Sequence, residues 1–225
     1  AWGKKLPEDV FLNDVLPYAN ANEVREAWRP KLRQKCLPLV KDCKSPGEAA
    51  HELNRKIFKL FGVRYSTKRN RADQAPAETI ETGLASCTGL SILLVDACRS
   101  VGVPARLAGT PNWVNKSGNH TWVEVWDDGW HFAGAAEPDS RGLDHGWFQG
   151  RAAQAIEDSP EHAIYAMSFR KTGTSFPLVW APGIDYVSAV NVTGRYVSAG
   201  AKPPEKPRLL VKVFDEKDGE RVVRS

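Results

Sequence analysis

Residues 83–90 read Gly-Leu-Ala-Ser-Cys-Thr-Gly-Leu, and a long apolar stretch of helical period begins at the cysteine, Cys87. A thiol in the first turn of a helix faces unpaired backbone N–H groups and the positive end of the helix dipole. Both favour the thiolate, which is the reactive form of cysteine. We therefore expect Cys87 to be a nucleophile at the start of a helix that ends near Gly102 and lies in the middle of the fold.

The period of the apolar residues changes after this helix. Before it, helical signals predict helices over residues 6–16, 21–28 and 46–61, and then a polar, irregular segment over 63–82. After it, the pattern predicts strands over 104–110, 119–126 and 130–136, a helix over 150–166, and strands and loops over 176–192. The expected fold class is α+β, with a helical N-terminal half and an antiparallel β-sheet packed against the Cys87 helix.

The strand over 119–126 carries a second chemical group, the imidazole of His120. Strand alternation places four large or ionisable side chains on one face: His120, Trp122, Glu124 and Trp126. A buried histidine or glutamate needs a polar partner, so a purely structural strand rarely presents such a face. Because its pKa lies near neutrality, His120 is able to take the proton of a thiol and return it to a leaving group.

A helix-borne cysteine, a strand-borne histidine and a following carboxylate, in this order, resemble the transglutaminase-like superfamily. Its members include transglutaminases, peptide N-glycanases and bacterial cysteine proteases or amidases. The matching motifs are residues 85–89 (Ala-Ser-Cys-Thr-Gly), 102–106 (Gly-Val-Pro-Ala-Arg), 118–125 (Gly-Asn-His-Thr-Trp-Val-Glu-Val) and 128–130 (Asp-Gly-Trp). The resemblance covers residues 53–139. It implies a papain-like, transglutaminase-core fold, Cys87 and His120 as catalytic residues, and chemistry that needs no metal or organic cofactor.

One residue departs from the family pattern. The resemblance implies an aspartate, often followed by proline, soon after Trp130, but position 134 is a glycine. Glu137, which precedes Pro138, is the best replacement, because residues 134–136 could form a bulge. Asp139 is the second choice for the third catalytic residue. An enzyme that works with the Cys87–His120 dyad alone is the remaining alternative.

Other side chains are candidates for binding rather than for bond making. Trp113 and Trp122 are expected in the substrate cleft. The Cys87 backbone N–H is expected to stabilise an oxyanion, and the resemblance implies a second donor, either a side chain upstream of the helix or an indole N–H of Trp113 or Trp122. His131 is a weaker candidate for the base, because its place on the return strand is more typical of a packed or exposed histidine. Asp144 and His145 are expected in a surface loop.

Composition excludes several other classes of protein. The 225 residues carry a net charge of +4, with basic and acidic residues interspersed, which argues against a nucleic-acid surface. No apolar run is long enough to cross a bilayer.

The other cysteines are not expected to form a disulfide or a zinc site. Cys98 is expected to be a buried hydrophobe, and a Cys36–Cys43 disulfide is not favoured. The histidines do not cluster with cysteines as they would in a zinc site. The expected organisation is a catalytic domain over 1–200, then a Pro-rich linker and a β-hairpin over 201–225.

The predicted function is that of a cysteine-dependent enzyme that cleaves or exchanges an amide bond through a thioester, with hydrolysis preferred. Its substrates would be proteins, peptides or glycopeptides. An inactive domain that binds peptide or glycan, and a structural spacer, are the alternatives from other classes. The resemblance, and a first residue other than methionine, are compatible with a periplasmic or secreted protein.

Overall fold

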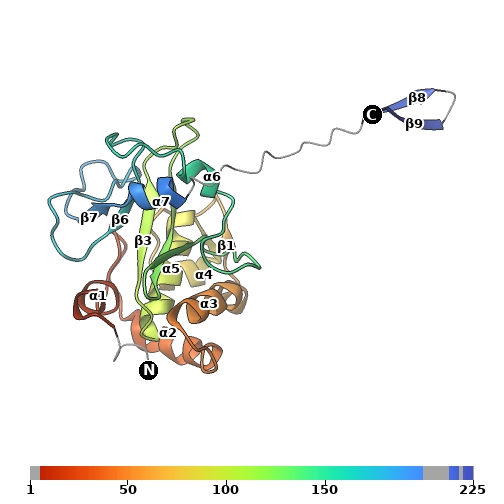
Figure 1. Ribbon diagram of the computed structural model, residues 1–225. Helices are drawn as coiled ribbons and strands as arrows, with labels where there is room; N and C mark the ends of the chain where they lie inside the picture. The colour runs from red at the N-terminus through yellow and green to blue at the C-terminus, as the bar shows by residue number, and fades with distance from the viewer. Residues whose placement is uncertain (1–5, 200–212, 218–219, 225) are drawn as a thin grey trace.

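The computed structural model describes residues 6–199, 213–217 and 220–224. A five-stranded sheet organises them (Figure 1), in the order β5 (Trp130–Ala133), β4 (His120–Trp126), β3 (Ala105–Thr110), β6 (Tyr165–Met167) and β7 (Ala189–Asn191). Every neighbouring pair in this sheet is antiparallel. The α+β fold class predicted from the sequence is confirmed, and so are the three strands after the Cys87 helix.

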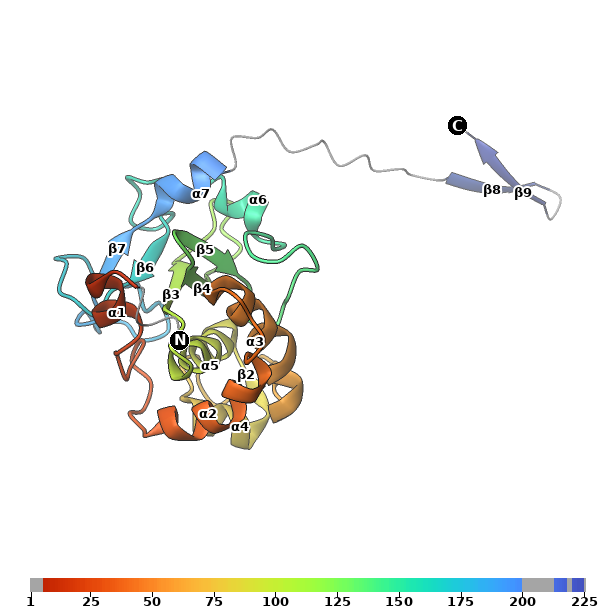
Figure 2. The same ribbon diagram turned by 60° about the horizontal axis from the view of Figure 1, so that its bottom comes forward.

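The helices lie in layers on both faces of the sheet (Figure 2). Helix α5 (Cys87–Ser100) packs directly on β3 and β4, and three further helices cover it: α2 (Trp28–Cys36), α3 (Pro46–Phe61) and α4 (Pro76–Thr82). The opposite face carries α6 (Gln149–Ala152) and α7 (Thr193–Ala199). The remaining short elements are α1 (Glu8–Asp14), the 3-10 turn Leu37–Leu39, and β1 (Arg64–Tyr65), which pairs in parallel with β2 (Leu84–Ala85).

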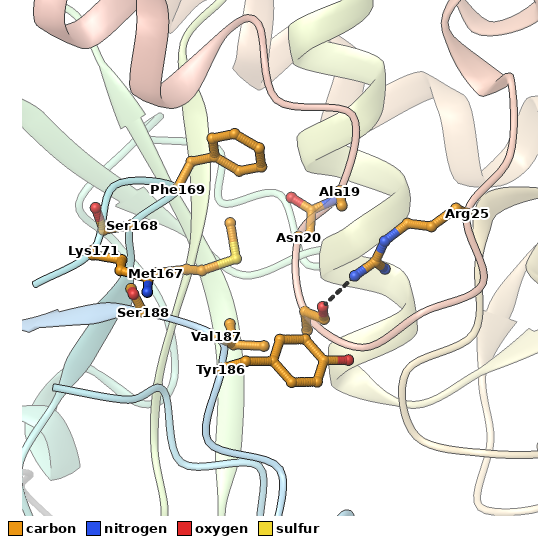
Figure 3. A pocket seen from close by; sticks show the side chains of 11 residues that line it. Ala19, Asn20, Arg25, Met167, Ser168, Phe169, Lys171, Tyr186, Val187 and Ser188 are labelled. Atoms are coloured by element: carbon orange, nitrogen blue, oxygen red, sulfur yellow. Dashed lines mark hydrogen bonds between the residues drawn. The ribbon is translucent and has the colours of Figure 1, made fainter. Parts of the chain in front are cut away.

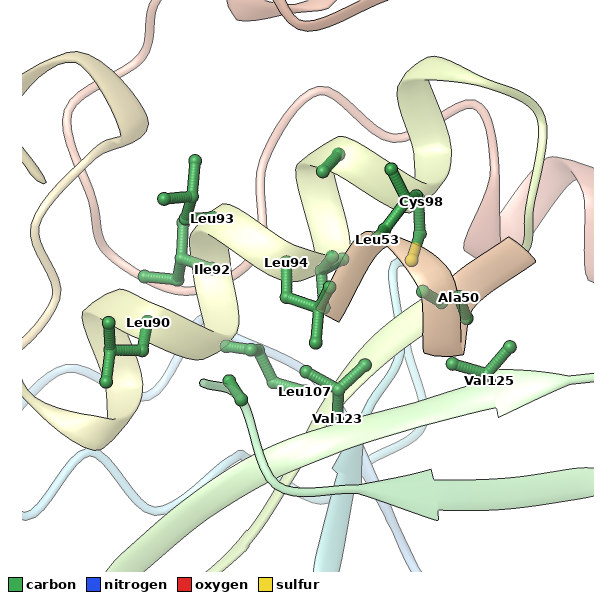
Figure 4. Packing of buried hydrophobic residues seen from close by; sticks show 14 of the residues in the cluster. Ala50, Leu53, Leu90, Ile92, Leu93, Leu94, Cys98, Leu107, Val123 and Val125 are labelled. Atoms are coloured by element: carbon green, nitrogen blue, oxygen red, sulfur yellow. The ribbon is translucent and has the colours of Figure 1, made fainter. Parts of the chain in front are cut away.

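Helix α5 is the centre of the main core, as predicted. Residues 88–100 are all buried, so the helix is enclosed rather than amphipathic. Figure 4 shows its leucines meeting the β-branched residues of β4 and the small residues of α3, among them Leu94, Val123 and Ala50. Cys98 is fully buried in this cluster, and all four cysteines are free thiols.

The other face of the sheet holds a second, aromatic core. It consists of Trp113, Trp122, Phe132, Phe148 and Tyr196, together with several small and branched residues. Strand alternation divides β4 between the two cores, because Val123 and Val125 belong to the first and Trp122 to the second. His120, at the beginning of β4, stands at the end of the aromatic core.

Helix α3 begins and ends where the sequence predicts. The Ser45 hydroxyl accepts the backbone N–H of Glu48 at 3.2 Å, and Pro46 occupies the first helical position. Gly62 ends the helix with φ of +67°, in the left-handed region that glycine adopts without strain.

The prediction of a helix over 21–28 is wrong. Residues 21–27 are not helical, and the Glu23 carboxylate accepts the backbone N–H groups of Asn20 and Ala21 at 2.6 and 2.7 Å. Helix α2 begins at Trp28, so Pro30 lies in its first turn, where the missing N–H costs no helical hydrogen bond.

Two other segments also differ from expectation. The polar stretch 63–82 contains helix α4, which begins at Pro76. The helix predicted over 150–166 is only the short α6, because residues 165–167 instead form β6 between β3 and β7. Tertiary strand pairing overrides the helical pattern there.

The C-terminal segment forms the predicted hairpin, in which β8 (Val213–Lys217) pairs antiparallel with β9 (Glu220–Arg224). The expected linker at 201–207 lies outside the described residues, and the division into two parts stays a prediction. Within the described part of the chain, no helix has the length and apolar character required to span a membrane.

Candidate active site

Cys87 is the first residue of α5, as its sequence context predicts. Ser86 caps the helix: its hydroxyl oxygen accepts the backbone N–H groups of Thr88 and Gly89 at 3.0 and 3.1 Å. The same hydroxyl donates to the Ala72 carbonyl at 2.5 Å, which ties the helix start to the preceding loop. Cys87 is therefore held on a fixed helix end, as a partly buried residue with a free thiol.

The start of α5 is fastened to the start of β4 through Thr121. The Thr88 hydroxyl donates to the Thr121 hydroxyl at 3.0 Å, and the Ser91 hydroxyl donates to the Thr121 carbonyl at 3.3 Å. Because Thr121 directly follows His120, these contacts attach the start of α5, which Cys87 begins, to the start of β4, which His120 begins.

Burial raises the pKa of the Cys87 thiol above its usual value. Hydrogen bonds from the Thr121 backbone, from Thr88 and from the N–H groups of the first turn of α5 act in the opposite direction but do not outweigh burial. The prediction of a lowered pKa is therefore wrong for the free protein. The expected N–H groups are present, but the sequence does not show how deeply the sulfur is enclosed.

His120 is enclosed by aromatic rings. Its imidazole centre lies 4.9 Å from Trp147, 5.2 Å from Phe148, 5.8 Å from Trp122 and 6.0 Å from Trp113. Burial, helped by the positive charge of Arg151, lowers the pKa of His120 to about 4. At neutral pH the imidazole is therefore uncharged and available as a proton acceptor. Among the described residues, its buried Nε2 has no hydrogen-bond partner.

The Glu137 carboxylate occupies the space that a side chain at position 134 would need. Residues 134–137 form a turn in which the Glu137 N–H donates to the Gly134 carbonyl at 3.2 Å and Ala136 has φ of +64°. A Cβ atom on Gly134 would lie 2.7 Å from Glu137 Oε2. Gly134 thus makes room for Glu137, as expected if this acid replaces an aspartate at 134.

Glu137 lies near His120 without a hydrogen bond to it in the described structure. Its Oε2 instead accepts the indole N–H of Trp147 at 2.7 Å, and the Trp147 ring packs on the imidazole. Partial burial raises the pKa of Glu137, while the Trp147 bond acts to lower it. The side chain of Trp147 therefore contacts both the Glu137 carboxylate and the His120 imidazole.

Asp139 is engaged elsewhere. Arg141 donates to both of its carboxylate oxygens at 2.9 and 2.8 Å, and these bonds lower the pKa of the exposed Asp139. Of the two candidate acids, Glu137 is therefore the one that the structure brings towards His120.

The expectation that Trp113 and Trp122 line a substrate cleft needs correction. Both indoles are buried, and Trp122 N–H donates to the Tyr196 hydroxyl at 2.7 Å. They stack on each other with centres 6.1 Å apart, so their role is to pack behind His120. The pattern alone could not reveal this, because a large indole serves interior and cleft equally well.

Three aromatic residues at the site were missed as candidates. Trp147 and Phe148 contact His120 from the loop before α6, and Trp180 shares a shallow depression with His120 and Thr121. The Trp180 indole N–H is buried and has no partner among the described residues. The sequence signal was the high tryptophan content after residue 110, which does not indicate which indoles reach the site.

His131 is far from the nucleophile. It pairs with Val125, five residues along β4 from His120, which is about 17 Å at the rise of a strand. Its Nδ1 lies 2.6 Å from Asp144 Oδ2, and the two side chains line a cavity of about 270 Å³ together with Glu124 and Arg195. The structure therefore does not place His131 as the base for Cys87.

Another cavity, of about 210 Å³, lies between the segment around Asn20 and the loops around Met167 and Tyr186 (Figure 3). Arg25 and Lys171 give its rim positive charge, and Arg25 donates to the Ala21 carbonyl. Cys87 and His120 do not belong to its lining, so the cavity is separate from the candidate active site.

Cys87 begins the central helix and His120 begins an antiparallel strand that packs against it, which is the arrangement that the resemblance to the transglutaminase-like superfamily implies. The family comparison agrees with this resemblance: the model of the transglutaminase-like superfamily matches residues 33–135. The match includes Cys87 and His120 and ends before Glu137. Among curated proteins, none has a sequence that matches this chain.

Solved structures similar to the chain are distant in sequence. A proposed cysteine protease from Cytophaga hutchinsonii shares 18% identity over 84% of this chain, with a TM-score of 0.46. The periplasmic domain of TgpA from Pseudomonas aeruginosa, bound to ethylmercury, shares 18% identity over 56%, with a TM-score of 0.38. A proposed protease from Parabacteroides distasonis shares 10% over 67%, also with a TM-score of 0.38. The chain spans 64%, 48% and 29% of these three structures.

Proposed function

We propose that the protein is a cysteine-dependent acyl-transfer enzyme that cleaves or exchanges an amide bond through a thioester, with hydrolysis as the preferred outcome. The observation that carries this proposal is the attachment of the capped start of α5, where Cys87 is the first residue, to Thr121, the residue next to His120. The free thiol of Cys87 and the neutral imidazole of His120 would form the reacting pair.

The chemistry begins from an uncharged pair. His120 takes the Cys87 proton as the sulfur attacks the carbonyl carbon of the amide, which gives a tetrahedral oxyanion and an imidazolium. The imidazolium then protonates the departing amine, the C–N bond breaks, and the thioester forms. Water that loses a proton to His120 hydrolyses the thioester and returns the thiol; an amine in place of water completes a transamidation.

Backbone and indole N–H groups supply the stabilisation that the oxyanion needs. The N–H of Cys87 lies in the first turn of α5, where the helix dipole also favours negative charge. Trp180 is a better second donor than Trp113 or Trp122, because its buried N–H has no partner among the described residues and lies in the depression beside His120. Trp122 N–H is already bonded to Tyr196.

Glu137 completes the proposed triad by orienting His120 and stabilising the imidazolium that forms. Its position over Gly134 supports this role, and so does its bond to Trp147, whose ring packs on the His120 imidazole. The substrates would be proteins, peptides or glycopeptides that present a peptide bond, a glutamine carboxamide or a glycan-linked asparagine.

Turnover of three substrate classes tests the proposal. We would assay unmodified peptides, N-linked glycopeptides and glutamine donors with an added amine, using wild type and Cys87→Ala. The proposal predicts release of amine or ammonia by wild type on at least one class, and none above background by the variant. Cys43→Ala is the matched control, because Cys43 is also a partly exposed free thiol. Equal rates for wild type and Cys87→Ala would remove the proposed function.

A further inference from the structure

The indole of Trp147 connects the candidate acid and the candidate base. Its N–H donates to Glu137 Oε2 at 2.7 Å, and its ring centre lies 4.9 Å from that of His120. The guanidinium carbon of Arg151 lies 5.3 Å from the same ring. Trp147 is nevertheless 55% exposed, which is unusual for a tryptophan whose only task is packing.

The bond from Trp147 affects the charge of Glu137. Partial burial favours the neutral carboxylic acid, whereas an N–H donor favours the carboxylate. Only the carboxylate is able to orient and stabilise an imidazolium through a charge-assisted hydrogen bond. Without the indole N–H, the carboxyl group would lose both its fixed orientation and part of its preference for the charged form.

The imidazole has an open position for such a bond. His120 Nε2 is buried and has no partner among the described residues, although buried polar atoms are normally satisfied. The Trp147 bond engages Oε2 of Glu137, and a carboxylate carries a second oxygen that is able to accept Nε2–H.

We propose that Trp147 is a positioning residue of the reaction: its indole N–H holds Glu137 over Gly134 so that the carboxylate serves His120. This inference rests on the proposed function. It differs from a packing role, because it assigns the effect to one N–H group acting through one carboxylate. It also differs from the opposite role, in which the bond from Trp147 would keep the Glu137 carboxylate away from His120.

Alkylation of Cys87 by iodoacetamide tests the inference without a known substrate. The rate would be measured at pH 7 by peptide mapping in Trp147→Phe, Glu137→Gln, the double variant and His120→Ala, with Cys43 as the reference thiol in each chain. Trp147→Phe keeps an aromatic ring and loses the N–H. We expect it to slow alkylation of Cys87 roughly tenfold, the size of one hydrogen bond to a charged group, and to leave Cys43 unchanged.

The double variant separates positioning from packing. If Trp147 acts through Glu137, Trp147→Phe has no further effect once Glu137 is Gln. Trp130→Phe is the matched control, because Trp130 lies on β5 against Arg106, and it should react like wild type. Thermal unfolding of each variant would verify that the fold is retained.

The outcomes distinguish the two proposals. Slow alkylation in His120→Ala together with wild-type rates in Trp147→Phe overturns the positioning role alone. A faster alkylation of Cys87 in Trp147→Phe than in wild type also overturns the positioning role, because it would mean that Trp147 keeps Glu137 away from His120. If Trp147→Phe slows alkylation by the same factor in the wild-type chain and in Glu137→Gln, the effect does not pass through Glu137 and Trp147 only packs against the site. A wild-type rate in His120→Ala overturns the proposed function, and the positioning role with it.

Discussion

At the residue scale, the free protein holds both Cys87 and His120 in the uncharged state. Burial raises the pKa of Cys87 and lowers that of His120, so at neutral pH the pair is a thiol and a neutral imidazole. The sequence predicted the helix start and its N–H groups correctly, because both follow from local pattern. It could not predict the enclosure of His120 by rings such as Phe148 and Trp147, which come from a loop distant in the chain.

The charge of Arg151 should affect the acid limb of the pH–rate profile. Arg151 helps to lower the pKa of His120 to about 4, so Arg151→Met should raise that pKa. Because protonated His120 cannot accept the thiol proton, activity falls as pH drops through this pKa, and the acid limb should move to higher pH in the variant. The measurement is kcat/KM against pH. Arg141→Met, which alters an exposed arginine paired with Asp139, should leave the limb in place.

The choice between the two candidate acids has a simple test. Glu137→Gln keeps the bond from Trp147 but removes the negative charge, so we expect kcat to fall roughly a hundredfold. Asp139→Asn breaks a surface ion pair with Arg141 and should leave kcat unchanged. Steady-state kinetics on the same substrate compares them. The opposite ranking would assign the third catalytic position to Asp139.

At the scale of elements, a buried asparagine links α3 to the turn that carries Glu137. Asn54 Nδ2 donates to the Gly134 carbonyl at 2.8 Å, and its Oδ1 accepts the Ala136 N–H at 2.9 Å. The sequence indicated a bulge at 134–136 from its small residues, and the turn is present. Asn54 gave no signal, because its partners are 80 and 82 residues away in the chain.

Removal of this link should affect both stability and catalysis. Asn54→Ala leaves two backbone groups of the turn without their partner, which should lower the free energy of unfolding by about 2 to 4 kcal/mol. Activity at a temperature where the variant is fully folded should also fall, since Glu137 loses its anchored position. Urea unfolding and kinetics at low temperature measure the two effects. Asn115→Ala is the control, because that exposed side chain bonds only within its own loop.

At the scale of the whole molecule, buried polar groups attach the N-terminal segment to the end of α5. Arg99 is 1% exposed and donates to the carbonyls of Asp14, Ala19 and Ala105. The sequence predicted the fold class, the central helix and the three strands that follow it from periodicity. It could not predict this attachment, nor strand β6 where a helix was expected, because both depend on partners remote in the chain.

Asp14 should make the stability of the protein depend on pH. Burial raises its pKa from 3.8 to about 6, so its contribution is fully present below about pH 4 and is lost as pH rises through 6. Asparagine does not ionise, so Asp14→Asn does not lose this part of its free energy of unfolding as pH rises. Its free energy of unfolding relative to wild type should therefore increase by about 2 to 3 kcal/mol between pH 4 and pH 7. His120 contributes the opposite slope in both proteins, so it cancels in this difference. Urea unfolding at several pH values measures it, and a constant difference would contradict the buried charge.

The central claim is that Cys87 becomes acylated with the help of His120. Its most direct measurement is mass spectrometry of the protein after rapid mixing with a p-nitrophenyl ester of a short acyl group. The account predicts one acyl group on the peptide that contains Cys87, removable by hydroxylamine as a thioester is, and much slower labelling in His120→Ala. Acylation of Cys43 at the same rate as Cys87, or labelling of Cys87 that does not depend on His120, would contradict it.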